Sequence, residues 1–406
     1  MSTNIAARRT STAGQIRTFR GPALLSYGFR PFFLFGAIWA AFVVAIWLPI
    51  LSGDLVLPTA FDALSWHAHE LIYGYVPAIV AGFLLTAVPN WTGRLPVTGT
   101  PLLALFALWV AGRLAVLGSA ALGPSIAAAI DVSFLLALGG VIAREIVAGK
   151  NTRNLKVLGV VGVLLAGNVT FHLEALQGAP TGYGARIGIS ATLVLIMLIG
   201  GRIIPSFTRN WLARQAPGPL PAPFARFDAV AMIAGGAAVV AWTAAPGAQP
   251  TVWFALLAAL LHSLRLARWT GWRTLGEPLV TILHVAYAFV PLGFALLALA
   301  IVRPDVIQPF GALHAWTTGA IGLMTLAVMT RASLGHTGQP LTATWPIQLI
   351  YIAAMTAALG RIAAAFAFLR EPMLHVSAAA WVLAFVGFAV VYGPLLLRAR
   401  PGNETA

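Results

Sequence analysis

Two histidines and a glutamate open the segment WHAHELIYGYVPAIVAGFLLTAVPNWTGR, which occupies residues 66–94. After these polar residues the segment stays apolar for long enough to cross a lipid bilayer. Ionisable side chains are costly inside hydrocarbon, so within a membrane span they mark candidate functional sites. Imidazole and carboxylate groups together can hold a metal ion or relay protons. The pattern therefore predicts chemistry at the head of this span.

One face of this segment, wound as a helix, carries a histidine followed by very small side chains: His67, Gly74, Ala78 and Gly82. A flat macrocycle could lie against such a strip, and close packing of a second helix needs small residues as well. Both interpretations stay open. In a regular helix His69 points to the opposite side from His67, so the two histidines cannot bind the same metal ion. They serve two sites, or one binds metal while the other forms hydrogen bonds.

The composition predicts an integral membrane protein. Of the 406 residues, 59% are hydrophobic and 9% are charged, whereas soluble domains carry about 25% charged residues. Long apolar runs separated by short polar joints favour a helical bundle over an outer-membrane barrel. There is no cysteine, which excludes disulfides, iron–sulfur clusters, thiolate copper centres and covalently attached c-type haem. Any metal must be held by histidine, methionine, carboxylate or backbone oxygen.

The predicted fold is all-α, a polytopic transmembrane helical bundle. We expect a disordered cytoplasmic tail at 1–25, a single transmembrane helical domain at 26–400 and a C-terminal tail at 401–406. About twelve segments reach the length that a bilayer requires. These segments are 28–51, 66–89, 101–117, 124–146, 155–176, 185–204, 229–244, 251–266, 279–301, 310–329, 346–368 and 376–397.

Basic residues collect in alternate joints between these segments, which predicts that both termini are cytoplasmic. The net charge of +14 thus reports membrane topology and contact with lipid headgroups, and we expect no nucleic-acid partner.

Several histidines are expected at a similar depth, in the outer third of the bilayer. His67 and His69 open the second span, His172 lies near the outer end of the fifth, and His314 enters the tenth. For His67, His172 and His314 we favour metal or haem ligation over hydrogen bonding or proton relay. For His69 ligation and hydrogen bonding are equally open.

The remaining histidines are expected elsewhere in the bilayer. His284 enters the ninth span from the inner end, and ligation and hydrogen bonding are equally open for it as well. His336 lies in a predicted cytoplasmic loop, MTRASLGHTGQP. His262 and His375 are interpreted as hydrogen-bonding residues between helices.

Two glutamates accompany the outer histidines. Glu70 follows His69 directly, and Glu174 lies two residues after His172. Both could deliver protons or orient a histidine. For Glu70 the alternative is a simple electrostatic role in the first turn of its helix.

Seven segments resemble the blocks of a known family: GFRPFFLFG, WHAHELIYGY, AGFLLTAVPNWTGR, NVTFHLE, GGRIIPSFTRN, LHVAYAF and ALHAWTTGAIGLMTLAVMTRASLGHTG. In this order, from about Gly28 to Pro340, they resemble the NnrS family. The resemblance implies a multi-pass protein of the bacterial inner membrane that contains haem and copper and acts in nitric oxide metabolism, in denitrification or nitrosative stress. The matched positions that could carry these cofactors are His67, His69, His172, His284, His314 and His336.

The expected function is therefore a b-type haem protein, with or without copper, that binds nitric oxide or another diatomic and can reduce it with electrons from an unknown donor. Haem iron with one axial histidine keeps an open position for a diatomic, whereas two axial histidines favour electron transfer. The alternatives are a haem-based sensor or scavenger without turnover, and a transporter or metal-delivery protein that uses its membrane histidines.

Overall fold

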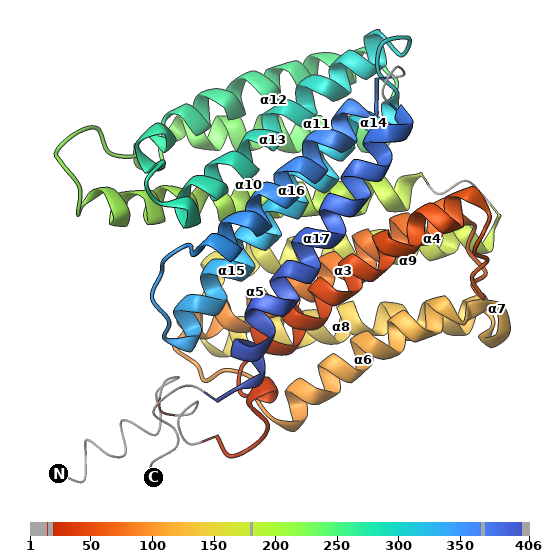
Figure 1. Ribbon diagram of the computed structural model, residues 1–406, viewed down its shortest axis with the longest axis horizontal. Coiled ribbons are helices and arrows are strands. Elements are labelled where there is room, and N and C mark those ends of the chain that lie inside the picture. The colour runs from red at the N-terminus through yellow and green to blue at the C-terminus, as the bar shows by residue number, and fades with distance from the viewer. Residues whose placement is uncertain (1–13, 15–18, 179–181, 367–369, 400–406) are drawn as a thin grey trace. The chain divides into compact units, whose positions relative to one another are not determined.

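A computed structural model describes residue 14 and residues 19–178, 182–366 and 370–399. Throughout these residues the regular structure is helical (Figure 1). Twelve helical stretches within them are long and apolar enough to cross a membrane. This confirms the predicted polytopic helical bundle, while the cytoplasmic side of the termini stays a prediction. Of the two predicted tails, residues 1–13, 15–18 and 401–406 lie outside the described part of the chain.

The helices group into two compact units. Of the described residues, unit 1 comprises those within 14–188, 332–340 and 388–399, and unit 2 comprises those within 189–331 and 341–387. Three long helices pass from one unit into the other: α10 (Tyr183–Leu212), α15 (Met324–Thr337) and α17 (Arg370–Leu397).

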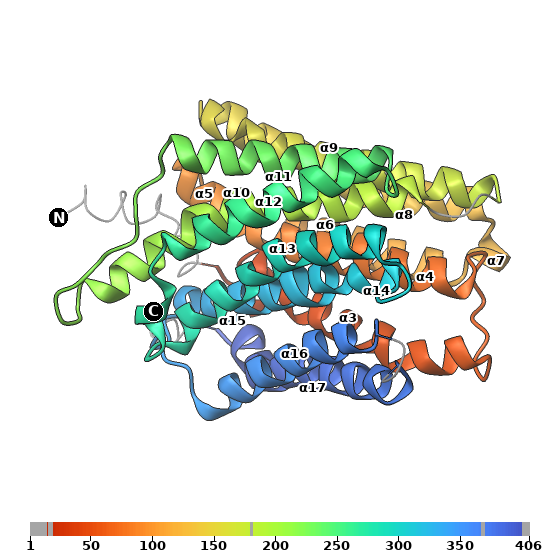
Figure 2. The same cartoon turned by 90° about the horizontal axis from the view of Figure 1, so that it is seen from above.

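Unit 1 is built from the amino-terminal helices. They are η1 (Ala23–Leu25), α3 (Phe29–Ser52), α4 (Ala63–His69), η2 (Glu70–Tyr75), α5 (Val76–Thr92), α6 (Thr100–Leu117), α7 (Ser119–Leu122), α8 (Pro124–Ala148), η3 (Thr152–Asn154) and α9 (Leu155–Leu176). Helix α3 packs on α5, α6 on α8, and α8 on α9 (Figures 1 and 2).

Unit 2 contains most of the remaining helices. They are α11 (Arg226–Ala244), α12 (Gln249–Ala267), η4 (Gly271–Thr274), α13 (Pro278–Val302), α14 (Pro309–Ala312), η5 (Ala315–Leu323) and α16 (Trp345–Ala363). Helix α12 packs against both α11 and α13 (Figure 2). The segment η5 packs against α13 and α16.

The second span is one continuous helix with a π-helical segment, η2, inside it. Pro77 has no N–H to donate to the carbonyl of Tyr73, four residues earlier, so a regular α-helical ladder cannot continue there. The Val76 N–H instead bonds the carbonyl of Leu71, five residues back. π-Helical segments are rare and occur frequently at functional sites. A second π-helix, η5, follows His314 in the tenth span.

Helix α3 covers the strip of small residues on the second span. The His67 ring stacks on Trp47 of α3, with centroids 4.1 Å apart. A Cβ added to Gly82 would lie 2.6 Å from the Phe33 ring of the same helix. Close helix packing is therefore the interpretation that the structure supports, and side chains of α3 occupy the strip on which a macrocycle was considered.

Two helix ends lie beyond the predicted boundaries. Helix α10 continues through Pro205 to Leu212, eight residues past the expected end of the sixth span. Helix α15 continues to Thr337, so His336 lies in its last turn. The prediction that His336 lies in a loop is therefore wrong. Gly338, with φ of 78°, ends that helix, because the left-handed conformation is easily adopted by glycine.

Candidate metal centre

A cluster of six polar side chains lies buried inside unit 1. His69 ends α4, and Glu70 begins η2 directly after it. The other members come from three further helices: Arg113 from α6, Asp131 from α8, and Asn168 and His172 from α9. Each of the six residues is at most 5% exposed. The five helical segments, of which α4 and η2 belong to one span, thus converge on one enclosed polar centre.

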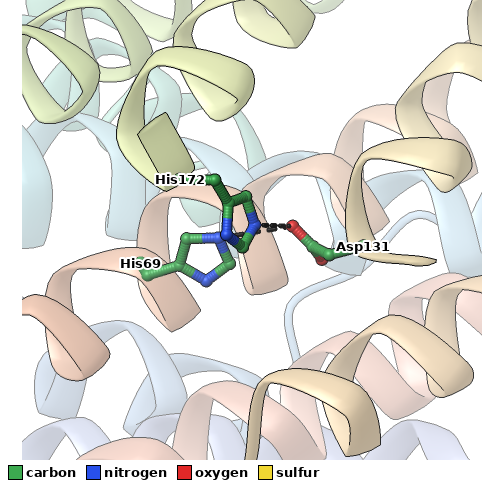
Figure 3. Close-up of side chains that lie close together, drawn as sticks. All are labelled: His69, Asp131 and His172. Carbon is green, nitrogen blue, oxygen red and sulfur yellow. Dashed lines mark hydrogen bonds and ion pairs between the residues drawn. The ribbon is translucent and has the colours of Figure 1, made fainter. Parts of the chain in front are cut away.

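Three of these side chains present metal-binding atoms to one another (Figure 3). Oδ2 of Asp131 lies 3.0 Å from Nε2 of His172 and 3.3 Å from Nε2 of His69. One ligand atom from each residue lies within 4.8 Å of those of the other two. A tetrahedral ion with bonds of about 2.0–2.1 Å keeps its ligand atoms about 3.3 Å apart. The spacing therefore fits a small transition-metal ion.

The guanidinium group of Arg113 bridges the two carboxylates of the cluster. Its NH1 atom donates to both oxygens of Glu70 at 2.7 Å, and its NH2 atom donates to Oδ1 of Asp131. Gly74 allows this contact, because a Cβ there would lie 2.4 Å from NH1 of Arg113. The indole N–H of Trp39 also donates to Glu70, at 2.9 Å. Both acidic side chains are thus fixed in position.

The charges of the cluster do not balance. Two carboxylates face one guanidinium, so with neutral histidines one negative charge remains in a region shielded from water. An uncompensated charge in such surroundings costs several kcal/mol. A cation held by His69, His172 and Asp131 would neutralise it.

Two of the three candidate ligands, His69 and Asp131, are oriented by hydrogen bonds to neighbours. Nδ1 of His69 lies 2.9 Å from Oε1 of Glu70, and its Nε2 lies 3.1 Å from Oδ1 of Asn168 and 3.3 Å from Oδ2 of Asp131. The amide N–H of Asn168 donates to Oδ2 of Asp131 at 2.8 Å. At metal sites the outer N–H of a ligating histidine commonly donates to a carboxylate, as His69 can to Glu70, and this bond sets the tautomer. Aromatic rings of Phe61 and Phe171 lie against the His69 ring, each with centroids 5.2 Å away.

The same centre does not fit a haem with two axial histidines. The imidazole rings of His69 and His172 are 4.8 Å apart between centroids, and they make direct edge contact at 64°. A porphyrin would have to pass between them, where the carboxylate of Asp131 contacts both rings. The donor set of two imidazoles and one carboxylate suits copper, zinc or non-haem iron.

Of the site residues predicted from the sequence, three meet in this cluster: His69, Glu70 and His172. His67 lies against Trp47 of α3, as described above. His336 packs its ring against Tyr27 and Phe29, with centroids 5.4 and 5.6 Å away.

The predicted residues in unit 2 have other contacts. Nε2 of His284 lies 2.8 Å from the Thr208 hydroxyl, and Nδ1 of His314 lies 2.9 Å from the carbonyl of Phe310 in the preceding turn.

Glu174 does not join the cluster. Its carboxylate accepts hydrogen bonds of 2.8–3.1 Å from the N–H groups of Gly182, Tyr183 and Gly184. These are free donors at the start of α10, and a carboxylate there is also favoured by the helix dipole. The position of Glu174 therefore supports a capping role and not proton delivery to the centre.

Sequence reasoning missed Arg113 and Asp131. A signal for both was present, because each is the sole ionisable residue in a long apolar stretch, 100–117 and 124–143. Two opposite charges alone in neighbouring spans are expected to pair.

Helices suited to spanning a membrane and a buried histidine–carboxylate centre define a polytopic membrane protein with an internal polar site. The chain belongs to the NnrS family: the profile of that family, described as NnrS protein, matches residues 23–400. The match confirms the family resemblance seen in seven blocks and extends it beyond Pro340, where the sequence offered no distinctive block. A search of curated proteins found no match.

Proposed function

We propose that this chain is a metal-dependent membrane protein of nitric oxide metabolism, with an ion bound by His69, Asp131 and His172. One observation carries the proposal: two buried imidazoles and a buried carboxylate lie at ligand spacing in a cluster with an excess negative charge. Copper is the ion we favour, because imidazole is a good ligand for it and the family resemblance implies it. When bound, copper would supply redox chemistry and affinity for a small diatomic such as nitric oxide.

The surrounding residues have distinct tasks in this proposal. Glu70 accepts the Nδ1 proton of His69, so that Nε2 can bind the ion in place of its contact with Oδ1 of Asn168. Arg113 holds Glu70 and Asp131 in place and lowers the electrostatic repulsion between them. Phe61 and Phe171 pack on the His69 ring, which limits the access of water. Glu70 is also the carboxylate best placed to deliver a proton, since it contacts a ligand histidine directly.

Haem b stays a second proposed cofactor. His69 and His172 are excluded as axial haem ligands, because Asp131 contacts both rings where a porphyrin would have to lie. The candidate axial ligands are therefore His67, His284, His314 and His336. The function would then be the binding and reduction of nitric oxide in the bacterial inner membrane, with electrons from a donor still to be identified. Binding without turnover, as in a sensor or scavenger, is the alternative.

A metal-delivery protein would use the same ligands for an ion in transit. The buried position of all three ligand side chains, at most 5% exposed, favours an ion that stays bound.

The test is a metal count on the purified full-length protein and on single variants. We expect about one copper per polypeptide at this centre, lost in His69→Ala, His172→Ala and Asp131→Asn. His375→Ala is the matched control, because His375 is exposed and its Nδ1 lies near the carbonyl of Glu371 in its own helix. Equal copper content in the wild type and in all three ligand variants would reject the assignment.

A visible spectrum and an activity assay then separate the functional alternatives. A Soret band that shifts on addition of nitric oxide supports haem. Formation of nitrous oxide under anaerobic conditions with an electron donor distinguishes a reductase from a sensor.

A further inference from the structure

Unit 2 has a buried polar cluster of its own, formed by α11, α12 and α13. It contains Asp228, His262, Arg265 and Tyr287, each at most 3% exposed. Nε of Arg265 donates to Oδ1 of Asp228 at 3.1 Å, and NH1 donates to the Tyr287 hydroxyl at 2.9 Å. The carboxylate is matched by the buried Arg265 and, at 3.5 Å, by the partly exposed Arg268. This cluster therefore has no charge deficit to explain, and its unusual feature lies in the histidine.

The two ring nitrogens of His262 have different surroundings. Nδ1 lies 2.8 Å from the Tyr287 hydroxyl. Nε2 is buried and makes no hydrogen bond of ordinary geometry within the described part of the chain. Leaving a buried polar atom unsatisfied costs about 1–3 kcal/mol. Such an atom in a native protein calls for a partner, and a metal ion is one that a neutral imidazole can take.

A thioether sulfur lies beside this nitrogen. A Cβ added to Gly235 would lie 2.6 Å from Nε2 of His262 and 2.7 Å from Sδ of Met197. Both atoms thus flank the small space above the Cα of Gly235. Met197 is fully buried. A Cβ at position 235 would collide with both atoms, and glycine avoids that collision.

We propose that Nε2 of His262 and Sδ of Met197 form a copper(I) site in unit 2. Thioether sulfur is a soft ligand that selects copper(I), and imidazole binds copper as well. Bonds of about 2.0–2.1 Å to nitrogen and about 2.3 Å to sulfur require the two donors to be at most about 4.4 Å apart. Two atoms that both lie within 2.7 Å of one point can have that separation.

The neighbouring charges select a monovalent ion. Arg265 contacts Tyr287, which in turn contacts the ring of His262, so the guanidinium charge is close to the site. Its repulsion is partly offset by Asp228. A divalent ion would suffer twice this repulsion and would lack a carboxylate ligand, since Asp228 is engaged with Arg265 and with Arg268.

A competing partner exists for the ring of His262. The carbonyl oxygen of Ala231, one turn before Gly235 on α11, also faces it. If the His262 ring only bonds this carbonyl, Met197 is a packing residue and not a metal ligand. The experiment below separates these two roles of Met197.

The test loads the purified full-length protein with copper(I) under anaerobic, reducing conditions and records copper content and X-ray absorption. We expect a sulfur ligand at about 2.3 Å in the wild type. Met197→Leu should lose this sulfur signal and the copper ion that gives rise to it, with little effect on folding because the two side chains have similar volume. Gly235→Ala keeps both donors but fills the space between them, and it should lose the ion as well.

Met232→Leu is the matched control. The Met232 sulfur lies 3.1 Å from NH1 of Arg265, so this second thioether of the same unit should be dispensable. A wild-type spectrum without sulfur, or a Met197→Leu spectrum identical to the wild type, overturns the proposal. His172→Ala keeps the outcomes of the two proposed sites distinct, because it should remove the ion of unit 1 and leave the sulfur signal intact.

Discussion

Replacing Arg113 by methionine should strongly destabilise unit 1. The substitution keeps a long, flexible side chain but removes the charge that holds Glu70 and Asp131 together. The lost interactions are two hydrogen bonds of 2.7 Å to Glu70 and one to Asp131. Glu70 is 0% exposed and Asp131 is 2% exposed, so water cannot compensate for the missing guanidinium. Breaking one partner out of a buried ion pair typically costs about 3–5 kcal/mol.

The measurement is the free energy of unfolding of purified protein in detergent, followed by tryptophan fluorescence in the presence of a chelator so that metal binding does not contribute. Arg303→Met is the matched control, because Arg303 forms an exposed pair with Asp305 and its loss should have no measurable effect.

A second substitution tests the electrostatic cause. In the Arg113→Met background, Glu70→Gln removes one of the two unpaired carboxylates and should recover part of the lost stability. The double variant should therefore be more stable than the sum of the single effects predicts. If Arg113→Met unfolds like the wild type, or if the two effects are simply additive, the account of this cluster as a charge-coupled unit is wrong.

Two further predictions concern residues outside the cluster. Glu174→Ala should destabilise the protein by about 1 kcal/mol through loss of the cap at the start of α10, while copper content stays unchanged; a loss of copper would restore a role for Glu174 at the centre. His67→Ala or His314→Ala should lose haem while His375→Ala retains it, as judged by the haemochrome spectrum. An unchanged haemochrome in both of the first two variants would move the axial ligand to His284 or to another residue.

The buried centre also shows how the fold makes a polar site tolerable inside apolar helices. Glycine at position 112 brings α6 close to α8, since a Cβ there would lie 3.0 Å from Oδ1 of Asp131. Glycine at position 74 gives Arg113 access to Glu70. We infer that larger residues at either position would separate the charges and leave them unpaired, which is costly in hydrocarbon.

The sequence by itself determined the class of the protein and the number of its spans. Length and apolarity are local properties, so twelve segments could be read without knowing how they pack. Helical periodicity is local as well, and it correctly placed His67 and Gly82 on one face, where both contact α3, and His69 on another, where its ring lies against Tyr73.

Only the tertiary structure decided which polar residues meet. His69, Asp131 and His172 are separated by 62 and 41 positions along the chain, and their side chains converge because α8 packs against α9 and the second span. Packing depends on the fit of whole helix surfaces, which no single segment encodes. For the same reason the sequence suggested Glu174 as a proton donor, whereas its contacts are with the first turn of α10.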